Sequence, residues 1–164
     1  MRTVLTIFLV AFLLGCDEPS NEKEQTAMEL DYLVFEFHDS SVPPPYHRSY
    51  KLSFKGEVVH AIVDSYGDVL TDTVINLGTE KVQKALVMIE KYKVTNKEKN
   101  EESEGCSGGT GISVRYGLGD EALCKGYVYF CAGDQFGDLS GDLTGLKHEL
   151  TNLIPNFSSL LKEE

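Results

Sequence analysis

Hydrophobic and polar residues alternate along several short stretches of this chain, and period-two alternation is typical of β-strands with one buried face. Between residues 30 and 37, for example, Leu33, Phe35 and Phe37 share one side, whereas Glu36 is on the other. Similar runs, bounded by Gly, Pro or short polar turns, recur along the chain. We therefore predict strands over residues 30–37, 49–54, 58–64, 69–75, 112–116 and 123–131.

Two further segments repeat apolar residues every three or four positions, which predicts amphipathic helices. They span residues 80–92 and 143–154. Thr79 and Asp142 stand where N-caps are expected, and Pro155 is placed to end the second helix.

The order of these elements is β-β-β-β-α-β-β-α, and the short connections between strands indicate antiparallel neighbours. The economical packing is an α+β fold of two layers, a mainly antiparallel sheet with two helices on one face. The charged run over residues 95–105 is interpreted as a solvated loop. Residues 133–142, GDQFGDLSGD, are interpreted as a turn leading into the helix cap, since their carboxylates lack the dense spacing of a calcium loop.

The stretch SVPPPYHR, residues 41–48, is expected to be a stiff loop because three prolines cannot continue a ladder. It presents Tyr46, His47 and Arg48 together, which makes these residues a candidate binding loop. The alternative is that the loop only packs against the edge of the sheet. A general-base role for His47 or His38 in a small hydrolase is a further alternative, although no nucleophile is evident beside either residue.

Three cysteines lie in the second half of the chain: Cys106, Cys124 and Cys131. In an exported protein, one disulfide and one free thiol are expected. Strand alternation places Cys124 on the apolar face and Cys131 on the other, so we predict a Cys106–Cys131 disulfide and a buried Cys124. No paired Cys-x-x-Cys spacing supports a metal site, and we expect neither a metal nor a cofactor.

The amino terminus has the layout of a secretory signal: Arg2, an apolar run over residues 4–14, and then Leu-Leu-Gly-Cys at residues 13–16. This motif resembles the bacterial lipobox. The resemblance implies that residues 1–15 are a lipoprotein signal peptide, that Cys16 is lipidated, and that a membrane holds the protein with its domain outside the cytoplasm. Residues 16–28 are then a polar tether and residues 29–164 an α+β domain. Asp17 leaves the choice between inner and outer membrane open.

The composition is acidic, with 15 Lys and Arg against 26 Asp and Glu and a formal net charge of −11. Such a surface disfavours nucleic acid and is compatible with a basic protein partner. The leading hypothesis is a non-enzymatic envelope lipoprotein that binds a partner or has a structural role. The alternatives are an acidic inhibitor or immunity-type protein that neutralises a basic partner, and the hydrolase considered above.

Overall fold

A computed structural model describes residues 29–101 and 108–162 of the 164-residue chain. Strands predominate in this part of the chain. The strands are β1 (Tyr32–His38), β2 (Ser49–Lys55), β3 (Val58–Ser65), β4 (Asp68–Asn76), β5 (Thr95–Asn100), β6 (Thr110–Leu118), β7 (Glu121–Cys131) and β8 (Asp134–Ser140). The helices are the 3-10 turn η1 (Pro44–Tyr46) and the α-helices α1 (Thr79–Lys91), α2 (Leu143–Leu153) and α3 (Phe157–Leu160).

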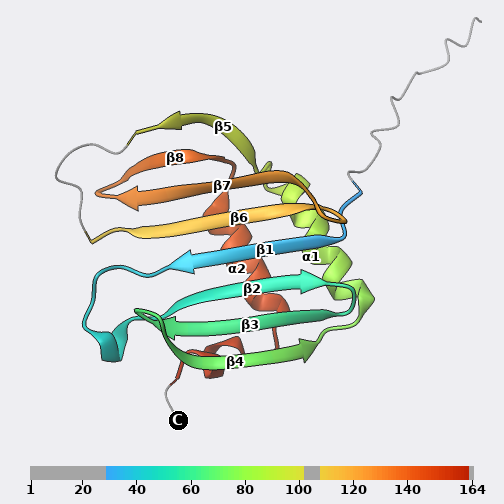
Figure 1. Ribbon diagram of the computed structural model, residues 1–164, viewed down its shortest axis with the longest axis horizontal. Helices are drawn as coiled ribbons and strands as arrows, with labels where there is room; N and C mark the ends of the chain where they lie inside the picture. The colour runs from blue at the N-terminus through green and yellow to red at the C-terminus, as the bar shows by residue number, and fades with distance from the viewer. Residues whose placement is uncertain (1–28, 102–107, 163–164) are drawn as a thin grey trace, which may run out of the picture.

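The strands form one sheet in the order β4-β3-β2-β1-β6-β7-β8-β5, and every neighbouring pair is antiparallel. Helices α1 and α2 lie behind this sheet as it is seen in Figure 1, both on the same face. The predicted α+β class, with an antiparallel sheet and two helices on one face, is confirmed.

The core lies between the sheet and these helices, and the alternation along the strands determines which side chains enter it. Leu33 and Phe35 of β1 are fully buried, as are Leu52 and Phe54 of β2. The helices contribute Val82, Ala85, Leu86, Met88, Ile89, Leu143, Leu146, Leu150 and Leu153. Each strand near the middle of the sheet therefore has one face in an apolar core and one face directed away from the helices.

The two predicted helix starts have different outcomes. Asp142 is the N-cap of α2, and its Oδ1 accepts a hydrogen bond from the Gly145 amide at 2.8 Å. Thr79 is instead the first residue of α1, preceded by Gly78 at the N-cap position, and its hydroxyl donates to Glu57. The prediction for Thr79 is thus wrong by one residue.

The loop predicted over residues 95–105 is wrong for its first part, because residues 95–100 form the edge strand β5. Every side chain of β5 is exposed, so no apolar alternation marks the strand in the sequence. β5 is a strand because its backbone pairs with β8, from Thr95 opposite Ser140 to Asn100 opposite Gly137. Exposed Lys and Glu side chains also suit an edge that must not recruit further strands.

The turn predicted before α2 is also wrong, because residues 134–140 form the strand β8. Gly137 interrupts its alternation with a φ of +112°. An added Cβ at Gly137 would collide with the Tyr127 carbonyl oxygen, so only glycine fits this close approach of β8 to β7. Because the bend interrupts the alternation, the sequence pattern does not indicate this strand, although its Phe136 and Leu139 are buried.

Beyond this bend, β8 separates from β7, and two side chains replace the interrupted ladder. The β7–β8 pairing extends only over Val128–Cys131 of β7. Further along, Asp138 Oδ1 accepts from the Tyr127 amide at 2.7 Å, and Asn96 Nδ2 donates to the Lys125 carbonyl at 3.0 Å. These bonds supply side-chain partners for β7 backbone groups beyond the end of the β7–β8 ladder.

Candidate binding face

The sheet face opposite the helices is the candidate functional surface. We call it the open face and define it by eight side chains in two rows that cross the central strands β2, β1, β6 and β7. The first row is Ser53, Val34, Arg115 and Lys125, and the second is Lys51, Glu36, Ser113 and Tyr127. Directly opposed residues of neighbouring strands project to the same side, so each row is a line of adjacent side chains.

The open face is locally cationic on an acidic protein. Lys51, Arg115 and Lys125 stand against two carboxylates that line the same hollow, those of Glu36 and Asp138, whereas the whole chain carries a formal net charge of −11. Glu36 forms an ion pair with Lys51 at 3.1 Å. The guanidinium carbon of Arg115 lies 5.7 Å from the ring centre of Tyr32, a cation–π distance.

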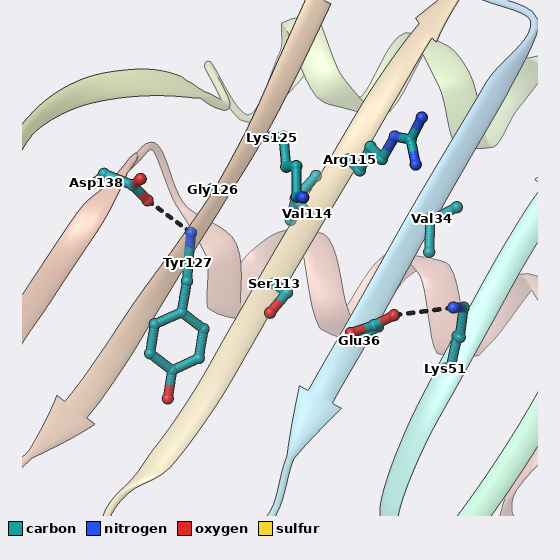
Figure 2. Close-up of a pocket in the computed structure, with 10 residues that line it drawn as sticks. All are labelled: Val34, Glu36, Lys51, Ser113, Val114, Arg115, Lys125, Gly126, Tyr127 and Asp138. Atoms are coloured by element: carbon teal, nitrogen blue, oxygen red, sulfur yellow. Dashed lines mark hydrogen bonds and ion pairs between the residues drawn. The ribbon is translucent and has the colours of Figure 1, made fainter. Parts of the chain in front are cut away.

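A shallow hollow of about 470 Å³ lies over the middle of this face. Figure 2 shows Arg115 and Lys125 along one side of it, the Glu36–Lys51 pair along another, and Asp138 bonded to the Tyr127 backbone. The hollow combines cations, a serine hydroxyl and an aromatic ring, and such a mixture can bind a polar ligand without taking part in chemistry.

A glycine on β6 positions the aromatic ring at the edge of the hollow. An added Cβ at Gly111 would collide with the ring and Oη of Tyr127, so the tyrosine lies directly over the glycine. The ring of His38 meets Tyr127 edge-on at 5.8 Å between centroids. The absence of a side chain at Gly111 thus determines where the Tyr127 ring can lie.

His38, one of the two histidines considered for catalysis, lies beside a hydroxyl. Its Nε2 is 3.0 Å from Ser113 Oγ, and the same nitrogen is 3.9 Å from Glu36 Oε2. A nucleophile–base–acid triad requires the carboxylate on the other ring nitrogen. The arrangement therefore brings a serine and a histidine together but does not have triad geometry.

His47, from the predicted binding loop, is buried, with 5% of its surface exposed. Its ring stacks on Tyr66 at 3.9 Å between centroids, and its Nδ1 accepts from the Tyr66 amide at 3.3 Å. Tyr66 has a φ of +54°, in the left-handed region, at the β3–β4 turn. These contacts give His47 a structural role in joining the loop to that turn.

Arg48 and Tyr46, the two chain neighbours of His47, have different surroundings. Arg48 Nε donates to the Leu161 carbonyl at 2.7 Å, and the Arg48 amide donates to Asp39 at 2.9 Å, so this residue links the loop to the C-terminal segment. Tyr46 is 74% exposed. Of the three predicted binding residues, Tyr46 is the one whose side chain is most accessible to a partner.

Cys124 is a free, buried thiol, as predicted. Burial raises its pKa, as does the Asp138 carboxylate, against opposing hydrogen bonds from Tyr116 and Asn96. Tyr116 is the cross-strand partner of Cys124, and its hydroxyl donates to the Val94 carbonyl at 2.8 Å. Burial raises the pKa of Tyr116 from 10.0 to about 12. This pair forms part of the packed interior rather than a reactive site.

Of the other three cysteines, the structure describes only Cys131. Cys131 is buried at the end of β7, and its neighbour Phe130 pairs with Thr110. Cys16 and Cys106 lie outside the described residues, so the lipidation and the Cys106–Cys131 disulfide stay predictions.

Neither metal ligation nor a membrane-spanning helix is evident in the part of the chain that the structure describes. Within residues 29–101 and 108–162, no three His, Cys, Asp or Glu side chains come together as metal ligands. None of the helices in those ranges is both long and apolar enough to cross a membrane.

The sequence interpretation missed the open face, although the period-two pattern contained a signal for it. The pattern assigns Glu36, Arg115 and Lys125 to the polar sides of their strands, but only the register between strands brings them together. Comparisons with known proteins add no further guide, because neither a family model, nor a curated protein, nor a solved structure significantly matches this chain.

The contacts of the loop predict opposite results for two adjacent alanine variants. His47→Ala removes a buried ring and the acceptor for the Tyr66 amide, so it should destabilise the fold by about 2 kcal/mol. Tyr46→Ala, at an exposed position, should change stability by no more than about 0.5 kcal/mol. Urea denaturation followed by circular dichroism measures both, and equal losses would contradict the structural role of His47.

Stability should also decline at alkaline pH, because Cys124 and Tyr116 have raised pKa values in the folded state. Above about pH 9 the unfolded chain releases these protons while the folded chain retains them, so the stability present below that pH is lost as pH rises. Tyr116→Phe should make the decline in urea midpoint between pH 9 and 12 shallower. Tyr46→Phe is the exposed control and should follow the wild type. Parallel curves for wild type and Tyr116→Phe would contradict this origin of the decline.

Proposed function

We propose that this chain is a membrane-anchored bacterial lipoprotein, and that its α+β domain is a non-enzymatic binding module whose open face meets the partner. The anchor is proposed from the lipobox-like residues 13–16 and the apolar run before them. The observation that carries the binding role is the open face itself, a cationic and aromatic sheet surface that no helix covers within the described residues.

The residue types on the open face favour a role in binding a partner over a role in solubility alone. A surface needed only for solubility could share the acidic character of the rest of the chain, whereas the open face gathers cations and aromatic Tyr127. Arginine and tyrosine are enriched among residues that dominate binding energy. The missing side chain at Gly111 also leaves room for the Tyr127 ring against the sheet, and an aromatic side chain with few rotatable bonds loses little entropy on binding.

A hydrolase is the second candidate, and the 3.0 Å contact between His38 and Ser113 is the observation in its favour. Two features weigh against it. The carboxylate of Glu36 approaches the same histidine nitrogen as the serine, and Glu36 is already paired with Lys51. Backbone amides in the middle of an antiparallel sheet are also occupied by the ladder, so they cannot supply an oxyanion hole.

The anchor is tested by replacing the thiol. Cys16→Ser should abolish incorporation of labelled palmitate in bacteria, because the hydroxyl cannot replace the thiolate in lipid transfer. Ser20→Ala, four residues along the same polar segment, is the control and should retain the label. A wild-type protein that takes up no label would refute the lipoprotein part of the proposal.

The binding role is tested by filling the hollow. The chain contains no tryptophan, so Val34→Trp places one large ring in the hollow, and Val87→Trp places the same ring at an exposed position of α1. With the full chain purified in a non-ionic detergent, Val34→Trp should lose capture of a partner from envelope extract while Val87→Trp retains it. Both should melt within a few degrees of the wild type. Equal capture by the two variants would exclude the hollow as the binding surface.

A further inference from the structure

We infer that the hollow of the open face binds a small ligand through a carboxylate group, which lies between Arg115 and Lys125. This inference rests on the proposed binding role of the open face and adds the chemical class of the ligand. It depends on the register of β6 and β7, on the contacts of the nearby acids, and on the kind of donors that the sheet offers.

Arg115 and Lys125 are directly opposed on neighbouring strands. Both side chains are exposed, and both line the hollow. Like charges directly opposite each other in an antiparallel pair destabilise the sheet. The pair therefore costs stability in the free protein, and an anion bound between the two cations would remove that cost.

The two acids that line the hollow, Glu36 and Asp138, are each bonded to a lining residue other than Arg115 and Lys125. Glu36 pairs with Lys51 at 3.1 Å, and Asp138 accepts from the Tyr127 amide at 2.7 Å. Among the described residues, no carboxylate lies within ion-pair distance of Arg115 or Lys125. On a chain with 26 acidic residues, two adjacent cations without a carboxylate are the feature that points to an external anion.

The available donors favour a carboxylate over a phosphate. Backbone amides of central strands are used by the ladder, and helices α1 and α2 lie on the other face (Figure 1), so neither of these helices directs its N-terminus at the hollow. Phosphate sites in proteins commonly use such backbone amides. What remains is the planar fork of Arg115, the ammonium of Lys125 and the hydroxyl of Ser113, a set that matches the two oxygens of one carboxylate.

The surroundings also provide for the rest of a small ligand. Val34 and the ring of Tyr127 line the same hollow and can contact its carbon skeleton. The volume of about 470 Å³ falls in the range of small-molecule sites. The 5.7 Å contact with Tyr32 helps to hold the Arg115 guanidinium in place before the ligand arrives.

The test is calorimetric titration of the full chain in non-ionic detergent with glutarate, a dicarboxylate, at constant ionic strength. Glutarate should bind saturably, and Arg115→Gln and Lys125→Gln should each weaken binding about tenfold or more, because each removes a charge-assisted hydrogen bond. Lys81→Gln, at an exposed position of α1, is the matched control and should leave the affinity unchanged.

Melting of the same variants separates binding from structure. Without ligand, Lys125→Gln should melt at or above the wild-type temperature, since it relieves the repulsion between the two cations. Arg115→Gln also loses the Tyr32 contact, so it should melt within a few degrees of the wild type. A lowered melting temperature for both would indicate a structural pair and overturn the inference. Inorganic phosphate that binds as tightly as glutarate, or glutarate binding that Lys81→Gln weakens equally, would also overturn it.

The two proposals fail in different ways. Loss of partner capture in Val34→Trp together with absence of glutarate binding to the wild type would retain the binding face and reject the carboxylate ligand. Glutarate binding that depends on Arg115 and Lys125, with capture unaffected by Val34→Trp, would retain the ligand site and reject the partner surface.

Discussion

The backbone ladder between β1 and β6 is the interaction on which the rest of this structure depends. It joins the meander β1–β4 to the strands β6–β8 in the middle of the sheet, from Tyr32 opposite Gly117 to His38 opposite Gly111. Because side chains alternate with a period of two, a shift of one residue in this ladder would move the inward residues of one half to the solvent side. The same register places Val34 beside Arg115 and Glu36 beside Ser113, so the core and the open face are determined together.

Both major helices lie on one side of the sheet, and this arrangement divides the molecule into two chemical environments. On the covered side, apolar residues from the strands and helices form one core. On the other side, the central strands present charged and polar residues, with tyrosines seated over glycines. An antiparallel sheet tolerates this division because its hairpins need no crossover helices on the second face. The open face is therefore available for binding without any cost to the core.

Several residues with reactive side chains contribute to packing in this fold. His47 joins a proline-rich loop to a strained turn through a stack and a hydrogen bond. Cys124 is enclosed beside Tyr116, where burial raises the pKa of its thiol. Asp138 and Asn96 complete a ladder where β8 separates from β7. The chemistry of a side chain in isolation does not reveal these roles, because each depends on a neighbour that is distant in the sequence.

Local periodicity and local hydrogen bonding made part of this structure predictable from the amino-acid sequence. The inward residues of β1 and β2, the apolar face of α1 and the Asp142 cap of α2 could all be predicted, because each is specified within a few neighbouring residues. Long-range packing was needed to identify residues 95–100 and 134–140 as strands, since β5 has no buried face and Gly137 bends β8. The burial of His47 and the pairing of Arg115 with Lys125 also arise from long-range contacts. These features follow from which strands become neighbours and in what register, and non-local backbone pairing leaves no periodic pattern in the sequence of a single strand.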